Sequence, residues 1–78
     1  MPFIHIRAYS GKDMETKKKV AQAIVEAASE AAGTPKTAYT VVYEDIDREE
    51  WEKNVKDPVI EPLRDMLIIE GGEFVEGI

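Results

Sequence analysis

The sequence predicts an α+β fold built on a single strand–helix–strand unit, followed by short C-terminal helices. Three observations predict it: apolar residues alternate over residues 2–9, recur at helical spacing over residues 14–32, and return in a β-branched, aromatic-rich run over residues 37–44. A crossover that contains a helix almost always makes its two strands parallel, with a right-handed connection. Because two strands under one helix leave both sheet edges bare, we expect two copies to pair into a four-stranded mixed sheet.

The first strand and the helix are delimited by the residues around them. Two isoleucines give the strand an apolar face. Asp13 follows a turn and suits the N-cap position, since its carboxylate can accept from the free N–H groups of the first helical turn. Gly33 suits the left-handed conformation that ends a helix, and Pro35 prevents its continuation.

The second strand, predicted over residues 37–44, is followed by an acidic segment. Asp47 with Glu50 three residues later matches a capping box. The pattern therefore predicts a second helix that runs through Trp51 and Val55.

Two prolines, Pro58 and Pro62, predict an interruption of that second helix, because proline lacks the N–H that an α-helix needs. A short helix over about residues 63–69 is expected to follow and to end at the Gly71–Gly72 pair. Residues 73–78 are compatible with a frayed tail or with a strand that docks on a neighbour, and nothing local decides between the two.

Length and composition indicate one small domain over residues 1–78 that assembles with copies of itself. A chain of 78 residues with no cysteine and one histidine lacks disulfides and zinc to support a thin core, so assembly is the expected remedy. The net charge of −6 argues against nucleic-acid binding. No apolar run approaches the roughly 18 residues of a membrane span, and the start of the chain does not read as a secretion signal, so we expect a cytoplasmic protein.

Pro2 is the residue to which we assign the chemistry. Initiator methionine is usually removed when the next side chain is small, and its removal here would expose a secondary amine. An internal proline has no basic nitrogen, whereas an N-terminal amine has a pKa of about 7.7–8.0, which an apolar pocket lowers. Such a base is neutral at working pH and suits proton transfer. Taken alone, Pro2 also fits a stiff residue at the start of an edge strand.

Five motifs follow one another along residues 2–51. They are Pro-Phe-Ile-His-Ile, a Gly-Lys-Asp turn, an amphipathic helix, a Thr-Pro hinge and a valine-rich strand. Together they resemble the 4-oxalocrotonate tautomerase family. The segment from Trp51 to the Gly71–Gly72 pair resembles the longer members, which form dimers rather than hexamers. The resemblance implies an isomerase that uses no metal and no organic cofactor.

The resemblance also implies roles for four residues. Pro2 matches the amino-terminal proline that acts as the general base. Lys12 stands where short members place an arginine that holds a substrate carboxylate; lysine keeps the charge but loses the two-pronged geometry. Thr40 stands where those members have a second arginine, so that charge is absent here. Trp51 matches the aromatic residue that lines the pocket and excludes water from the proline.

The absence of a second arginine favours a monocarboxylate substrate. A dicarboxylate needs two cationic anchors, and only Lys12 is assigned, with Arg7, Lys36, Arg48 and Arg64 as unproven replacements. We therefore expect keto–enol proton transfer on a small α-keto or enol carboxylate such as an aryl pyruvate. The expected assembly is a homo-oligomer, with a dimer favoured over a hexamer.

Each candidate also has a purely structural interpretation. His5 fits a strand residue at an interface, because no second histidine and no cysteine accompany it for a metal. The run Lys17–Lys19 fits a solvated helix face, and Trp51 fits a core position. For the whole chain, the alternative is a non-catalytic oligomeric module with the same fold that binds a small ligand or a protein. A retained Met1 favours that alternative, because it leaves Pro2 an unreactive amide.

Overall fold

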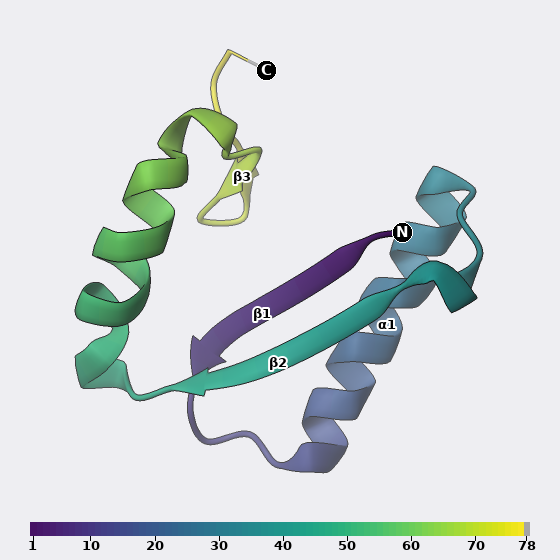
Figure 1. Ribbon diagram of the computed structural model, residues 1–78, viewed down its shortest axis with the longest axis horizontal. Coiled ribbons are helices and arrows are strands. Elements are labelled where there is room, and N and C mark those ends of the chain that lie inside the picture. Colours follow the sequence, from purple (N-terminus) through teal and green to yellow (C-terminus); the bar gives the residue numbers. More distant parts are fainter. Residues whose placement is uncertain (78) are drawn as a thin grey trace. The chain divides into compact units, whose positions relative to one another are not determined.

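The computed structural model describes residues 1–77, and its contacts divide the chain into two units, residues 1–48 and residues 49–77. The first unit contains β1 (Phe3–Tyr9), α1 (Met14–Ala32), the 3₁₀ turn η1 (Lys36–Ala38) and β2 (Thr40–Ile46) (Figure 1). The short turn η2 (Arg48–Glu50) lies at the division. The second unit contains η3 (Glu52–Ile60), η4 (Glu61–Met66), β3 (Ile69–Glu70) and β4 (Glu73–Phe74).

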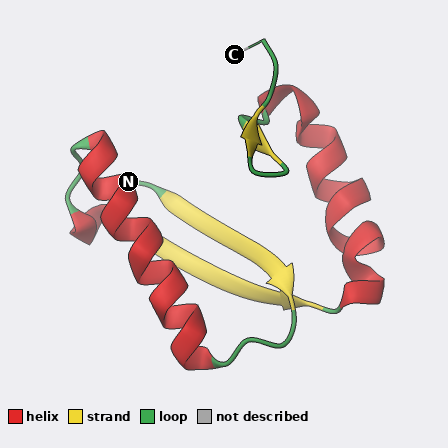
Figure 2. Cartoon of the chain, turned by 180° about the vertical axis from the view of Figure 1, so that it is seen from behind, coloured by secondary structure: helices red, strands yellow, loops and turns green. Residues whose placement is uncertain are grey.

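β1 and β2 form a parallel pair, and α1 connects them. Phe3 lies opposite Thr40 at one end of the ladder, and Tyr9 lies opposite Ile46 at the other. Figure 2 shows α1 lying across this pair of strands. The strand–helix–strand unit and its parallel pairing are thus confirmed, whereas the four-stranded sheet of two copies stays a prediction.

The two faces of the β1–β2 pair differ in cover. Ile4 lies opposite Val41 and Ile6 opposite Tyr43, and all four side chains are half-buried on the face toward α1. The other face is open in the first unit, where Phe3 leaves 63% of its surface exposed.

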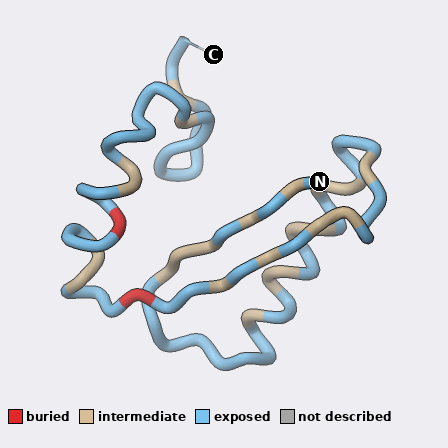
Figure 3. The backbone as a smooth tube through the Cα atoms, in the orientation of Figure 1, coloured by how far each residue is buried: buried red, intermediate tan, exposed pale blue. Residues whose placement is uncertain are grey.

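Within residues 1–77, only Ile46 and Val55 are buried (Figure 3). Each unit therefore contributes a single buried residue. So sparse a core is expected of a chain this short, which buries a smaller share of its surface than a larger domain does.

The predicted ends of the helix are confirmed in α1. Asp13 precedes the helix, and its Oδ1 accepts from the backbone N–H of Thr16 at 2.8 Å. These hydrogen bonds to Thr16 hold the pKa of the Asp13 carboxyl below its ordinary value. Gly33 has a φ of 71°, and its N–H donates to the Ser29 carbonyl at 2.9 Å, which closes the helix.

β2 begins at Thr40 and ends at Ile46, so the predicted bounds of 37–44 are wrong at both ends. Pro35 accepts from the Ala38 N–H at 3.0 Å, which folds residues 36–38 into the turn η1 instead of a strand. The β-branched and aromatic composition of this stretch did not reveal the turn, because hydrogen bonding after Pro35 overrides strand propensity there.

The predicted interruption at the two prolines takes the form of a change in helical winding, without a gap between the two helices. Pro58 lies inside η3, which is wound as a π-helix, and η4 follows it directly. The wider π turn moves the backbone away from the i−4 hydrogen bond that a proline cannot make. Pro62 lies in the first turn of η4, where an N–H is not needed for helical bonding. η4 covers residues 61–66 rather than the predicted 63–69.

The Gly71–Gly72 pair forms the turn of a hairpin and does not end a helix. Its φ angles are +61° and +86°, and positive values at both central residues define the type I′ turn that suits two-residue hairpins. β3 and β4 pair antiparallel across it, with Ile69 opposite Phe74. Residues 73–74 therefore pair within their own unit, and residue 78 lies outside the described part.

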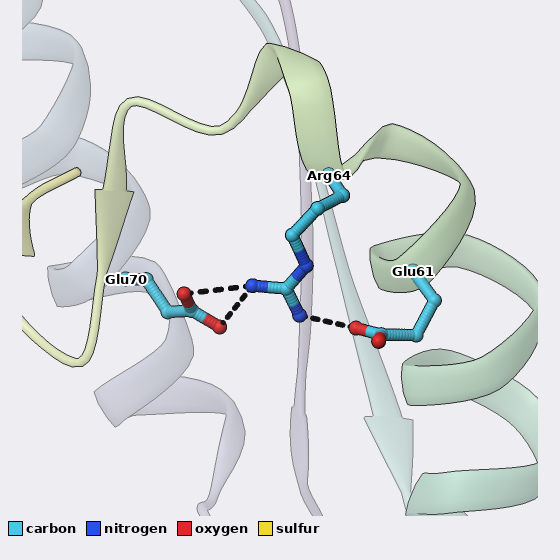
Figure 4. A network of polar contacts seen from close by, with 3 residues as sticks. All are labelled: Glu61, Arg64 and Glu70. Carbon is cyan, nitrogen blue, oxygen red and sulfur yellow. Dashed lines mark hydrogen bonds and ion pairs between the residues drawn. The ribbon is translucent and has the colours of Figure 1, made fainter. Parts of the chain in front are cut away.

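Arg64 ties the hairpin to η4 (Figure 4). Its Nη1 donates to both carboxylate oxygens of Glu70 at 2.8 Å, and its Nη2 donates to Glu61. The hydrogen bonds that Arg64 donates to Glu61 and Glu70 raise its pKa. Over the described residues 1–77, no helix is long and apolar enough to span a bilayer.

Candidate functional site

Pro2 lies directly before β1, beside the first residue of β2. The backbone N–H of Thr40 donates to the Pro2 carbonyl oxygen at 3.2 Å, which extends the parallel ladder by one bond. Proline has no N–H of its own, so its carbonyl is the backbone group through which β2 can hold it. Pro2 is half-buried, whereas Met1 is fully exposed. The structure thus brings Pro2 and Thr40 together.

Lys12 lies at the other end of β1, in the turn that leads to α1. A strand rises about 3.3 Å per residue, so Pro2 and Tyr9 are roughly 20 Å apart. Even if residues 10–12 doubled straight back, they would recover only about 10 Å. Within one chain, Lys12 and Pro2 therefore lie beyond opposite ends of β1. Lys12 is exposed, and no acidic side chain pairs with it among residues 1–77.

Trp51 belongs to the second unit, where it is half-buried directly before η3. Its role beside Pro2 stays a prediction. Of the four predicted site residues, the first unit holds three, and it joins only Pro2 to Thr40 directly.

The four possible replacements for a second arginine are all engaged within their own units. Arg7 Nε donates to Glu44 at 3.1 Å, and Lys36 Nζ lies 3.7 Å from Glu26. The Arg48 guanidinium lies 4.5 Å from the centre of the Tyr9 ring. Arg64 binds both Glu61 and Glu70. Each of these four cations thus has a contact within its own unit, and the role of Lys12 as a carboxylate anchor stays a prediction.

A polar cluster on the open face of β1 and β2 was not predicted. His5 Nε2 and Glu44 Oε1 are 2.7 Å apart, and Arg7 Nε donates to the same oxygen. The hydrogen bonds from His5 and then Arg7 hold the pKa of the Glu44 carboxyl below its ordinary value. Alternation places His5 and Arg7 on one face, but the register that puts Glu44 opposite Arg7 was not readable from one sequence.

Lys17 is folded against the sheet, so the interpretation of Lys17–Lys19 as a solvated face is wrong for its first member. The Lys17 side chain is only 14% exposed, and its Nζ lies 2.5 Å from Asp45 Oδ2 and 5.5 Å from the centre of the Tyr43 ring. Lys18 and Lys19 are exposed, as expected. No three His, Cys, Asp or Glu side chains gather into a metal-binding group in the described part of the chain.

The chain belongs to the tautomerase family. The family model described as "Tautomerase enzyme" matches residues 2–55, a stretch that begins at Pro2 and includes Lys12, Thr40 and Trp51. A protein of Lactococcus lactis subsp. lactis (strain IL1403), named as a probable tautomerase, is 35% identical over 46 residues, which cover 59% of this chain and 75% of the relative. The resemblance found in the sequence motifs is thereby confirmed.

Proposed function

We propose that this protein is a tautomerase that moves a proton between carbon and oxygen of a small α-keto or enol carboxylate. The general base in this proposal is Pro2, and no cofactor takes part. The family match over residues 2–55 is the observation that carries the proposal, since it supports tautomerase activity and its first matched residue is the proline. The hydrogen bond from the Thr40 N–H to the Pro2 carbonyl also supports the proposal, because it fixes the position of the base.

The proposed reaction is a balanced isomerisation. The secondary amine of Pro2, uncapped by loss of Met1, takes a proton from the carbon next to the carbonyl. The electron pair moves onto the carbonyl oxygen, and the protonated amine then delivers the proton to that oxygen. The reverse sequence converts the enol to the ketone, and proton transfer by a positioned base supplies roughly 10²–10⁴-fold in rate.

Lys12 enters the proposed site from a second copy of the chain. In one chain β1 separates Lys12 from Pro2, whereas antiparallel pairing of two β1 edges brings one end of each strand to the other end of its neighbour. Its ammonium then attracts the substrate carboxylate and stabilises the enolate that develops. A homodimer is therefore the smallest assembly that completes the site.

The remaining proposed contacts limit the substrate. Thr40 offers a hydroxyl but no charge, and Trp51 excludes water from the proline. Because Arg7, Lys36, Arg48 and Arg64 are engaged elsewhere, one lysine holds one carboxylate. The proposed substrates are monocarboxylates such as aryl pyruvates.

The test combines an intact mass with a kinetic assay. Protein purified from its own host is expected to lack one methionine, and it is expected to ketonise phenylpyruvate enol. Pro2→Ala is expected to lower kcat by about 10²–10⁴-fold. Pro35→Ala is the matched control, because it alters an exposed proline outside the proposed site and is expected to keep the parent rate.

Equal rates for Pro2→Ala and the parent protein would remove proline from the mechanism. A full-length mass with no ketonisation of phenylpyruvate or 2-hydroxymuconate would support the alternative, a non-catalytic oligomeric module with this fold.

A further inference from the structure

We propose that a pocket between α1 and β2 is a second ligand site, which binds a small monocarboxylate with an apolar body. The pocket has a volume of about 220 Å³ and is largely open to solvent. Its lining residues are Met14, Lys17, Lys18, Ala21, Val41 and Tyr43. None of them belongs to the proposed proline site, so the two sites use different residues.

The pocket exists because a small side chain faces the sheet. Ala21 presents only a methyl group opposite Val41, so α1 and β2 leave space between them. Lys17 does not fill this space, because its Nζ is held by Asp45 at 2.5 Å above the Tyr43 ring. The ion pair therefore keeps one wall of the pocket in place.

The charges at the pocket select an anion. Asp45 compensates the charge of Lys17, but Lys18 has no acidic partner among residues 1–77 and lies at the exposed rim. One uncompensated ammonium can pair with one carboxylate. Phosphate fits poorly, because the remaining lining is mostly apolar and offers few of the donors that its oxygens need.

The volume and the apolar lining set the size of the ligand. Drug-sized ligands occupy pockets of about 300–1,000 Å³, so this smaller pocket admits only a compact molecule. A single aromatic ring or a short branched chain next to a carboxylate fits the contacts with Met14, Val41 and the Tyr43 ring.

Benzoate is the probe for the test, because it has no α-hydrogen and cannot be turned over by the proposed tautomerase. In an NMR titration of the full-length protein, the amide signals of Ala21, Val41 and Tyr43 are expected to shift together with added benzoate. Lys18→Gln is expected to weaken binding by roughly two- to fivefold, the size of a partly exposed ion pair. The uncharged analogue benzamide is expected to bind the parent protein more weakly than benzoate does, by a similar factor.

Lys19→Gln is the matched control. It removes the same charge from the neighbouring residue, whose ammonium lies 3.7 Å from Glu15 and does not line the pocket, so benzoate binding is expected to stay unchanged. Equal weakening by Lys18→Gln and Lys19→Gln would overturn the proposal, since it would indicate a general charge effect.

A second variant tests the cavity itself. Ala21→Leu fills the space between α1 and Val41 and is expected to weaken benzoate binding more than tenfold, with circular dichroism as the check of folding. If this variant does not fold, Lys18→Glu replaces it and is expected to weaken binding more than Lys18→Gln does. Pro2→Ala is expected to leave the affinity unchanged. Shifts confined to residues outside the pocket, or lost in Pro2→Ala, would place benzoate elsewhere and refute the second site.

Discussion

Thr40 donates its backbone N–H to the carbonyl oxygen of Pro2 at 3.2 Å, so the first residue of β2 holds the residue that precedes β1. Proton transfer is sensitive to the position of the base, and a displacement of about 1 Å costs up to about 10²-fold in rate. The amide of Thr40 is therefore a positioning group for the proposed base, separate from any contact that its hydroxyl makes with substrate.

Thr40→Pro removes this amide donor and is expected to lower kcat by about 10- to 100-fold. Thr40→Val keeps the donor and removes only the hydroxyl, so its effect is expected in KM rather than in kcat. Steady-state kinetics of both variants with phenylpyruvate enol give the comparison, after thermal melts have shown that both are folded. A kcat that falls equally in the two variants would contradict a role for the amide.

Mixing two inactive variants tests whether each site is shared between chains. Pro2→Ala and Lys12→Ala are each expected to be nearly inactive as homodimers. After unfolding and refolding together, random pairing gives one intact site in every mixed dimer, so about a quarter of the parent activity is expected to return. The refolded mixture is measured against each variant treated alone, and no recovery would show that Pro2 and Lys12 act within one chain or not at all.

The Glu44 cluster makes stability depend on pH. The pKa of this carboxyl is held below its ordinary value of 4.5, by His5 first and by Arg7 second. The unfolded chain therefore binds the proton more readily, so Glu44 stabilises the fold above about pH 4.5 and this contribution is lost as the pH falls through the lowered pKa.

Glu44→Gln is accordingly expected to lower the urea midpoint at pH 7 and to converge with the parent protein toward about pH 3. Glu49→Gln, which alters another exposed acid, is the control and is expected to follow the parent curve throughout. If the urea midpoints of the parent protein and Glu44→Gln differed by the same amount at every pH, the cluster would contribute nothing to stability that depends on pH.

Arg64 is expected to control the opening of the β3–β4 hairpin. Arg64→Gln removes its ion pairs with Glu61 and Glu70, so the Val75 amide, which donates to Ile68 at 2.8 Å, is expected to exchange its hydrogen several-fold faster. Arg64→Lys keeps the positive charge but loses the forked guanidinium group. Its Val75 amide is expected to exchange at a rate between those of the parent protein and Arg64→Gln. Amides of β1 serve as the internal reference, and unchanged exchange at Val75 would mean that the Gly71–Gly72 turn alone holds the hairpin.

The first half of the fold was predictable because its signals are local. Asp13 and Gly33 determine where α1 begins and ends, through a capping hydrogen bond and a left-handed φ that each residue type favours. The start of β2 was missed because the turn after Pro35 depends on a hydrogen bond and not on composition. Composition also did not reveal the structure at Pro58, where a change of helical winding accommodates a residue that usually ends a helix.

The candidate site was predictable only in part. Pro2 was assigned from its chemistry and from the family resemblance, and the family is confirmed. The separation of Pro2 from Lys12 follows from the length of β1, whereas the partners of Glu44 and Lys17 depend on how β1, β2 and α1 are aligned across the fold. One sequence does not contain that alignment, because charge pairs between distant residues leave no local pattern.

The pairing of β1 with β2 also governs how the chain can acquire its structure. Arg7 and its neighbour Glu44 are 37 residues apart in the sequence, and all the other residue pairs between β1 and β2 have the same separation. During synthesis, β1 emerges from the ribosome long before its partner, and α1 is the element that can form in the interval. Loop closure is then shortened by a preformed helix, which makes the helical propensity of α1 a determinant of folding rate.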